Sequence, residues 1–429
     1  MDCSYLTREV RFPSGTTNSG QSGSMDHDSF DHGHSFFSVS IVLAISTSSL
    51  SRSSDSIISG NAVKLFHLAL FFREFTGLPN TVIGVQSILF LIQFAALNPS
   101  VLDAWYLIGV GMRTCVDLGL HQDPHPQSSV LPSLLETRRR LWWSMYSVDR
   151  SMSLSCGRPT EISDSVIRAE LPSFRIGGTA TEVEISGYLQ RYRILQLQSL
   201  IYDKLNESSQ TRQDGSDTVS NMRQRLSTWK SNNSSQHYPA LMESEFLMGN
   251  ILLYRPSRLI PNRSHEDLQA LWRSSVDFAR IYRQLAESNG IFYVQIGSEK
   301  AYWTGLAMLF SYWKLGPGTL RLSELWIGTR DIIFILQALS ERWEEGKVLA
   351  AKFEESTTKV IRAMEVGQAT VQEENDGEYN TGIPEEVMFF HTYSSLTSIW
   401  TAGQGTSTGG SSTHSENQLQ GLIAEMGKN

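Results

Sequence analysis

Apolar side chains recur every three to four residues along most of the chain, which is the period of an amphipathic α-helix. In residues 81–97, for example, Val82, Val85, Ile88 and Leu89 fall on one face of such a helix. No segment shows a competing alternation of apolar and polar residues, which a half-buried strand would need. The pattern therefore predicts an all-α fold.

The same spacing predicts helices along the rest of the chain, in residues 61–75, 101–116, 135–155, 184–205, 222–229, 241–253, 268–287, 302–313, 322–343 and 348–364. Ser100 and Asp103 predict a capping box at the start of the helix in residues 101–116, and residues 206–218 read as a polar loop. Helices of similar length, joined by turns that contain proline or glycine, predict stacked antiparallel αα-hairpins in one large helical domain.

The two ends of the chain differ from the middle in composition. Residues 1–35 are rich in Ser, Gly, Thr and Asp, which bury too little apolar surface to fold, so we expect a disordered N-terminal segment. The helical domain then covers residues 36–366. Its first apolar run, residues 39–50, is too short to span a membrane and lacks the basic flank of a signal peptide. We therefore expect it to form a buried first helix of the domain, with no membrane association.

Residues 367–429 form a tail that mixes acidic and bulky apolar residues, and most of it is expected to be disordered. Such tracts occur in activation segments that fold on a coactivator. An ordinary tail with one short docking helix around residues 387–390 is the alternative. The sequence leaves both interpretations open.

The most specific segment is residues 135–172, which read LETRRRLWWSMYSVDRSMSLSCGRPTEISDSVIRAELP. A helix that carries charged and aromatic side chains ends at Gly157 and Pro159, because glycine accepts left-handed backbone angles and proline cannot continue a helix. The segment contains no catalytic motif, so we interpret it as an element for packing and recognition.

This segment resembles the signature of the fungal-specific transcription factor domain, the middle homology region of zinc-cluster transcription factors. The residues that carry the resemblance are Arg139, Arg140, Trp142, Trp143, Asp149, Arg150, Gly157, Arg158 and Pro159. Residues 104–123, 251–261 and 338–355 resemble other parts of that family. The resemblance implies a nuclear transcription regulator of metabolic or secondary-metabolite genes. It also implies other transcription factors or coactivators as partners, a homodimer or heterodimer, and a small-molecule effector.

The cysteine count departs from the family. Its DNA-binding module uses six cysteines to hold two zinc ions, whereas this chain has Cys3, Cys115 and Cys156. We therefore expect no zinc cluster and no cofactor in this chain. Either the chain is a truncated gene product, or it is a regulator that does not contact DNA unaided.

The charge of the chain agrees with that expectation. The formal net charge is −8, from 36 basic and 44 acidic residues, and no basic stripe is visible. A surface that binds duplex DNA usually has a basic excess to neutralise phosphates. We expect DNA contact only indirectly, or through an N-terminal module missing from the sequence.

Four aromatic residues on predicted helices are candidates for an effector pocket: Trp142, Tyr146, Trp303 and Trp313. All-α proteins build ligand sites between helices, and aromatic side chains commonly line them. Filling of the hydrophobic core is the alternative.

A cytosolic all-α enzyme acting on a hydrophobic metabolite is the alternative function. It rests on His121, Asp123 and His125, which lie close together in sequence, and on the adjacent Asp149 and Arg150. The first group reads more simply as an exposed turn, and the second as a buried ion pair. We therefore expect no enzymatic activity.

Overall fold

The computed structural model describes residues 24–51, 56–72, 80–176, 180–206, 212–233 and 238–370, together with Val387. Within these ranges the chain forms twelve α-helices and a short 3₁₀ helix, and no strand. The predicted all-α fold is confirmed. No helix among the described residues combines the length and apolar character needed to cross a bilayer.

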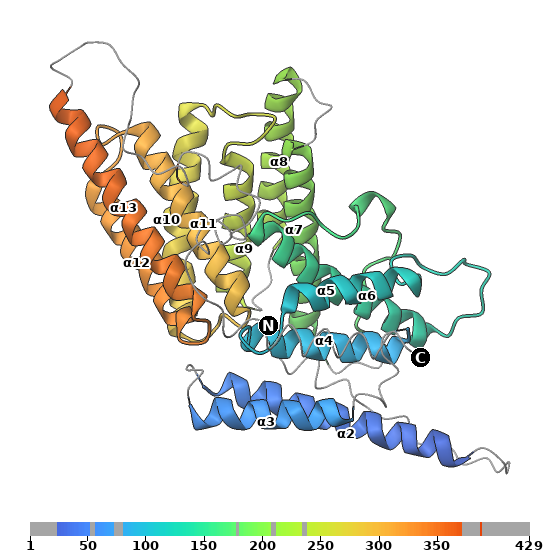
Figure 1. Ribbon diagram of the computed structural model, residues 1–429. Helices are drawn as coiled ribbons and strands as arrows, with labels where there is room; N and C mark the ends of the chain where they lie inside the picture. Colours follow the sequence, from blue (N-terminus) through green and yellow to red (C-terminus); the bar gives the residue numbers. More distant parts are fainter. Residues whose placement is uncertain are drawn as a thin grey trace.

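The first half of the chain builds one hydrophobic cluster, here called the N-terminal core. Its helices are α2 (Ser24–Ser49), α3 (Ile57–Phe71), α4 (Val82–Leu97), α5 (Ala104–Asp117) and α6 (Pro132–Cys156), which the short 3₁₀ helix η2 (Asp164–Val166) follows. Helices α2 and α3 lie side by side as a hairpin, and α2 also packs against α4 (Figure 1).

The second half builds another cluster, here called the C-terminal core. Its elements are α7 (Glu182–Asn206), α8 (Arg212–Asn232), α9 (Pro239–Tyr254), α10 (His265–Glu287), α11 (Val294–Leu315), α12 (Leu322–Ser340) and α13 (Glu345–Thr370). Consecutive helices again pack in pairs, α9 with α10, α10 with α11 and α12 with α13, as stacked hairpins require.

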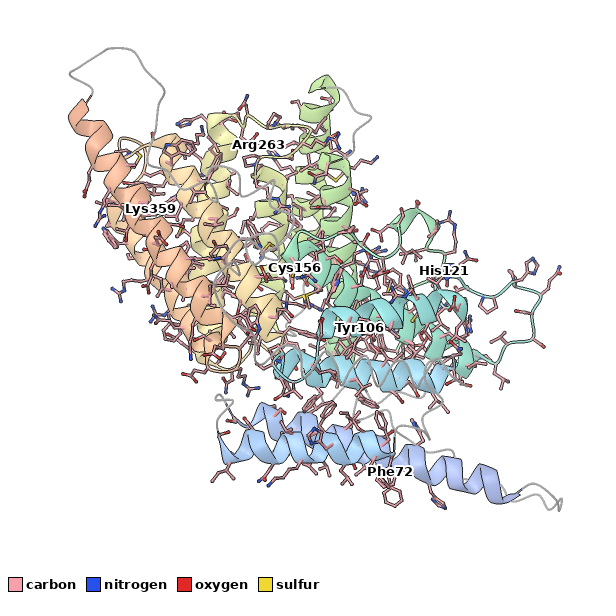
Figure 2. The ribbon with its side chains drawn as sticks, in the orientation of Figure 1. Phe72, Tyr106, His121, Cys156, Arg263 and Lys359 are labelled. Carbon is pink, nitrogen blue, oxygen red and sulfur yellow. The ribbon has the colours of Figure 1, made fainter. Side chains whose placement is uncertain are left out.

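Helices α7 and α11 join the two cores. Tyr192 of α7 and Ile296 of α11 belong to the N-terminal core. Ile201 of α7 and Leu306 of α11 belong to the C-terminal core. Each lies more than two turns beyond the residue of the same helix that belongs to the N-terminal core. Helix α6 also packs against α11, and Cys156 marks the end of α6 in Figure 2. The junction between the cores is therefore built from α6, α7 and α11.

Helix starts follow local side-chain chemistry. The Thr81 hydroxyl accepts a hydrogen bond from the amide of Gly84 at 2.9 Å, which satisfies an otherwise free donor at the start of α4. At α5 the predicted capping box is wrong. Asp103 alone is the cap, and its carboxylate accepts from the amides of Trp105 and Tyr106.

Two predicted boundaries also need correction. Helix α8 begins at Arg212, inside the predicted polar loop, because Val219, Met222, Leu226 and Trp229 present a buried stripe to the C-terminal core. Helix α2 begins at Ser24, inside the segment predicted to be disordered.

Of the tail predicted at residues 367–429, the structure describes residues 367–370, which continue helix α13 past the predicted boundary, and Val387. Val387 is fully buried and belongs to the C-terminal core. This contact is what the docking-helix interpretation of the tail predicts, and it leaves the activation-segment interpretation open.

Candidate functional site

Helix α6 carries most of the residues singled out in the sequence, and it buries them. Trp142 and Tyr146 are fully buried, and Trp143 is 2% exposed. The Trp143 indole donates a hydrogen bond to the carbonyl of Glu170 at 2.8 Å, and its ring meets Tyr146 edge-on. Indole and phenol rings with one polar atom are suited to hold a loop against a core in this way.

Arg139 binds the turn that precedes α6. Its Nε donates to Asp123 Oδ1 at 3.0 Å and its Nη2 donates to Asp123 Oδ2, a bidentate pair, while Nη2 also donates to Glu170 at 2.8 Å. The hydrogen bond that Arg139 donates to the Asp123 carboxylate raises the pKa of Arg139. Asp123 is therefore occupied by an arginine. His121 lies beside the ring of Trp142, and His125 is exposed, so the three residues do not form a catalytic or metal-binding group.

Arg140 and Glu136 fix the chain after η2. Glu136 accepts hydrogen bonds from Arg140 Nε at 2.9 Å, from the Phe174 amide at 2.6 Å and from the Ser173 amide at 3.1 Å. Burial alone raises the pKa of Glu136, but these donors lower it below its usual value. Phe174 has a φ of 57°, in the left-handed region that bulky residues rarely adopt. The Glu136 carboxylate stabilises that turn.

Asp149 and Arg150 form a buried ion pair in which neither side chain is exposed. Arg150 also donates to Asp164 at 2.8 Å and to the Ser199 hydroxyl at 3.2 Å, and it lies over the ring of Tyr146. Burial raises the pKa of Asp149 to about 6, against the opposing effect of Arg150. A buried charge that is paired and hydrogen-bonded in this manner joins structural elements, and no substrate reaches it in this conformation.

The Gly-Arg-Pro sequence ends α6 as predicted. Gly157 has a φ of 62°, and the amide of Arg158 donates to the carbonyl of Ser153. The Arg158 guanidinium then lies 4.5 Å from the ring centre of Trp105, whereas Pro159 is exposed. These residues turn the chain from α6 towards η2.

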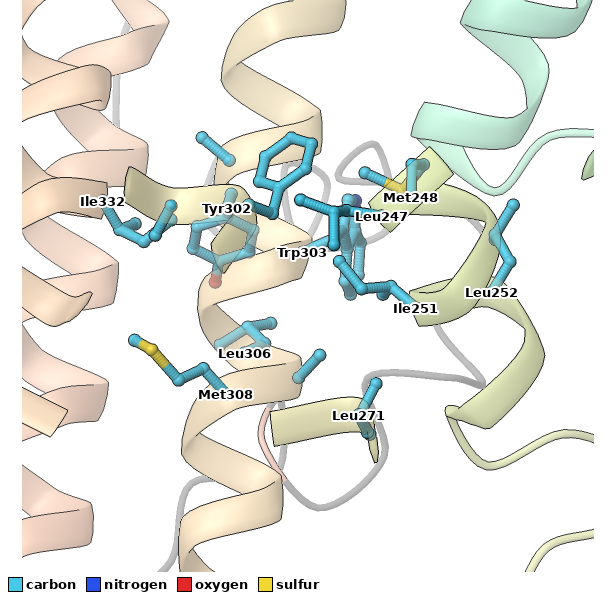
Figure 3. Packing of buried hydrophobic residues seen from close by; sticks show 14 of the residues in the cluster. Leu247, Met248, Ile251, Leu252, Leu271, Tyr302, Trp303, Leu306, Met308 and Ile332 are labelled. Atoms are coloured by element: carbon cyan, nitrogen blue, oxygen red, sulfur yellow. The ribbon is translucent and has the colours of Figure 1, made fainter. Parts of the chain in front are cut away.

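The four aromatic residues of the candidate effector pocket do not come together. Trp142 and Tyr146 belong to the N-terminal core, while Trp303 belongs to the C-terminal core and Trp313 packs against it. Figure 3 shows Trp303 on α11 directed towards Ile251 of α9. All four fill cores, which was the alternative interpretation.

A different group of polar residues surrounds a cleft at the junction of the two cores. Glu245 of α9 accepts hydrogen bonds at 2.9 Å from both Arg191 of α7 and Lys300 of α11. Gln198 donates to its other oxygen at 3.0 Å. The Ser151 hydroxyl of α6 accepts from Arg191 Nη2 at 3.2 Å. Five side chains from four helices thus meet in one buried network.

This network has more positive than negative charge. Arg191, Lys300 and Glu245 are each less than a tenth exposed. Burial raises the pKa of Glu245, but Lys300 and Arg191 lower it to about 2, so it is ionised near neutral pH. Two cations therefore share one carboxylate.

The cleft beside this network is small and largely apolar. Its hollow measures about 40 Å³, enough for a few water molecules. The walls that carry no charge come from α9, α10, α11 and the connection before α11, and comprise Leu241, Tyr282, Leu285, Gly290, Ile291, Phe292, Tyr293 and Ile296.

Four residues of these networks were not expected from the sequence: Glu136, Arg191, Glu245 and Lys300. Glu136 precedes Arg140 by four residues, a spacing that brings two side chains together on a helix, and that signal was available. The other three lie 54 and 55 residues apart along the chain, and no local pattern connects them.

The two cysteines that the structure describes, Cys115 and Cys156, are buried free thiols, and Cys3 lies outside the described residues. Burial raises the pKa of Cys115 to about 12, which opposes the thiolate form that zinc requires.

Comparison with known proteins finds a family match in the first half of the chain. Residues 26–231 match the family described as the fungal specific transcription factor domain. The chain is 26% identical to the positive regulator of purine utilization of Emericella nidulans, over 53% of this chain and 30% of that protein. It is 34% identical to pyrimidine pathway regulatory protein 1 of Saccharomyces cerevisiae, over 23% of this chain and 11% of that protein.

A third relative is the ABC-transporter-regulating transcription factor of Aspergillus fumigatus, 24% identical over 37% of this chain and 18% of that protein. The matched part of the chain thus spans less than a third of the length of each of these relatives. No solved structure matches the chain.

Proposed function

We propose that this chain regulates the transcription of metabolic genes, because residues 26–231 match the fungal specific transcription factor domain. The match over α2 to α8 is the observation that carries the proposal. Relatives named as regulators of purine utilization and of the pyrimidine pathway support metabolic genes as the targets.

We further propose that the chain acts in the nucleus through other proteins. The described cysteines do not fit a zinc cluster, and the net charge of −8 opposes non-specific attraction to DNA. The chain, as a homodimer or a heterodimer, would then reach promoters through the transcription factors or coactivators that it binds. A small-molecule effector that changes these contacts completes the proposal.

A reporter assay tests this function. The full chain is fused to a heterologous DNA-binding domain in yeast, and reporter expression is compared with that of the DNA-binding domain alone. We expect the fusion to change expression in either direction by several-fold. The substitution Arg280→Met, which removes an exposed charge, serves as a control that retains the effect. A nuclear, folded fusion with unchanged reporter expression contradicts the proposal.

The tail has its own test. Residues 368–429 fused to the same DNA-binding domain activate the reporter if they form an activation segment. A fusion no more active than the DNA-binding domain alone favours the docking interpretation, in which Val387 fixes the tail to the C-terminal core.

The geometry does not support the alternative of an enzyme. Its candidate residues, Asp149 and Arg150, have no exposed surface, and Asp123 is held by Arg139. The relatives are transcription regulators, which are not enzymes.

A further inference from the structure

One edge of the Arg191 guanidinium, formed by Nε and Nη2, has only part of its hydrogen-bond donors paired. The Nε and Nη2 atoms of an arginine form a fork that matches the two oxygens of a carboxylate. In Arg191, Nη2 donates to the Ser151 hydroxyl and Nη1 donates to Glu245, but the buried Nε has no hydrogen-bond partner. A buried, unpartnered donor on a charged group is costly, and a ligand that accepts from it removes that cost.

The same edge is filled elsewhere in this molecule. In Arg139 the Nε and Nη2 atoms hold both oxygens of Asp123. The comparison shows which chemical group fits the free edge of Arg191. At Arg139 a carboxylate accepts from both Nε and Nη2, whereas at Arg191 the Ser151 hydroxyl accepts from Nη2 and Nε has no acceptor.

The charge of the site also calls for an anion. Glu245 neutralises one of the two cations that bind it. Burial, together with the charge of Arg191, lowers the pKa of Lys300, as expected for a positive charge that Glu245 alone does not compensate. Both side chains are more than nine-tenths buried, so water screens this charge poorly. One bound monoanion would balance the cluster.

The cleft limits the size and character of that anion. A hollow of about 40 Å³ admits a carboxylate group with few further atoms. Leu241, Leu285, Ile291 and Phe292 line the remaining wall, so the rest of the ligand meets apolar surface. This combination favours a small organic acid over a phosphate, whose charge is spread over all its oxygens.

We propose that the cleft between α6, α7, α9, α10 and α11 binds a small monocarboxylate, whose carboxylate accepts from Arg191 Nε and Nη2 and whose aliphatic body packs on the apolar wall. The ligand contacts helices from both cores, so its binding links the N-terminal core to the C-terminal core. This identifies the chemical class of the effector in the proposed function, and to that extent rests on it.

Butyrate is the probe, because its short aliphatic body fits the apolar wall, and butyramide is its neutral counterpart. Binding to the purified full chain is measured by calorimetric titration at constant ionic strength, with the unfolding temperature as a second readout. We expect butyrate to bind at least tenfold more tightly than butyramide or inorganic phosphate. Equal binding of butyrate and butyramide, binding of phosphate in preference to butyrate, or no binding of butyrate overturns the proposal.

Two substitutions in the cluster change its charge in opposite directions. Lys300→Met leaves Arg191 and Glu245 as a balanced pair and should weaken butyrate binding at least tenfold. Glu245→Gln leaves both cations uncompensated and should tighten it. Lys314→Met removes an exposed lysine from the same helix, so it serves as the matched control and should bind butyrate as the original chain does. Binding that is unchanged in the folded Lys300→Met variant contradicts the proposed site.

Failure of the two proposals can be told apart, because the titration needs no promoter and the reporter assay needs no added acid. A chain that binds butyrate but leaves the reporter unchanged retains the ligand site and contradicts the regulator function. A chain that changes the reporter but does not bind butyrate retains the function and contradicts the site.

Discussion

The arginines of α6 and the buried cations at the junction differ in how their charge is balanced. The buried Arg150 meets two carboxylates, Asp149 and Asp164, and the partly exposed Arg139 likewise meets two, Asp123 and Glu170. The buried Arg140 pairs one to one with Glu136. At the junction the ratio is reversed, since Arg191 and Lys300 share Glu245 alone.

This difference separates structural charges from charges that are available to a ligand. A buried cation whose charge is compensated by protein carboxylates does not need a further anion, and its role is to hold segments together. A buried cation whose charge is not fully compensated, and which lies beside a cleft with an unpartnered N–H group, can still bind an anion. Substitutions at single positions test this contrast.

The largest effect is expected for Arg150→Met. The substitution leaves Asp149 and Asp164 without a cation next to a core, and removal of one partner from a buried pair typically costs about 3–5 kcal/mol. The free energy of unfolding in denaturant measures the loss. The exposed substitution Arg280→Met should cost almost nothing. If both variants unfold at the same denaturant concentration, Arg150 is not a structural charge.

The next effect concerns Glu299, which precedes Lys300 on α11 but lies near Cys156 and Arg158 at the end of α6. Burial raises its pKa to about 8, although the Trp303 indole, which donates to it at 3.1 Å, and the charge of Arg158 oppose the rise. A folded pKa above the unfolded value of 4.5 means that the folded state binds the proton more tightly.

The stabilising contribution of Glu299 to the free energy of unfolding is therefore fully present below about pH 4.5 and is lost as the pH rises through about 8. Relative to Glu299→Gln, the original chain should lose on the order of a few kcal/mol over this interval. Unfolding free energies at a series of pH values measure the loss, and Glu344→Gln, at an exposed position, is the control. A pH-independent difference between the original chain and Glu299→Gln would show that this carboxyl does not titrate as described.

A smaller effect is expected at the end of α6. Gly157→Ala places a Cβ atom on a residue with a φ of 62°, which costs roughly 1–2 kcal/mol for an L-residue. Gly60→Ala is the matched control, because this glycine lies inside α3 with nothing within 4 Å of the added atom. It should stabilise the chain by up to about 1 kcal/mol, since alanine favours helix. Equal changes in both variants would mean that Gly157 is not needed for the turn.

The smallest effect on stability is expected for Lys300→Met, at less than about 1 kcal/mol in either direction, because the Arg191–Glu245 pair stays balanced and methionine suits a buried site. Denaturant unfolding measures it beside Arg150→Met. A loss as large as that of Arg150→Met would remove the distinction between the two regions.

The helical fold and most of the helix positions could be predicted from the sequence, since the apolar period and the Gly and Pro turns are local signals. The stop at Gly157 and the burial of Asp149 with Arg150 were predictable for the same reason. The full length of α8 was not, because its polar sequence becomes helical only by packing a sparse apolar stripe on the C-terminal core.

The junction could not be found from the sequence for a related reason. Arg191, Glu245 and Lys300 come from three helices, and each alone reads as an ordinary solvated charge on its helix. Their meeting depends on how α7, α9 and α11 pack. The large aromatic residues, by contrast, suggested a ligand pocket in the sequence, but their side chains fill two separate cores.

The most direct test of the central claim observes the arginine Nε–H groups themselves. In a chain labelled with ¹⁵N at arginine Nε, the Arg191 signal is assigned with Arg191→Lys and followed by nuclear magnetic resonance as butyrate is added. The account predicts that the Arg191 signal shifts and saturates while those of Arg139 and Arg150, already held by carboxylates, stay in place. An unchanged Arg191 signal, or equal shifts at all three arginines, would contradict it.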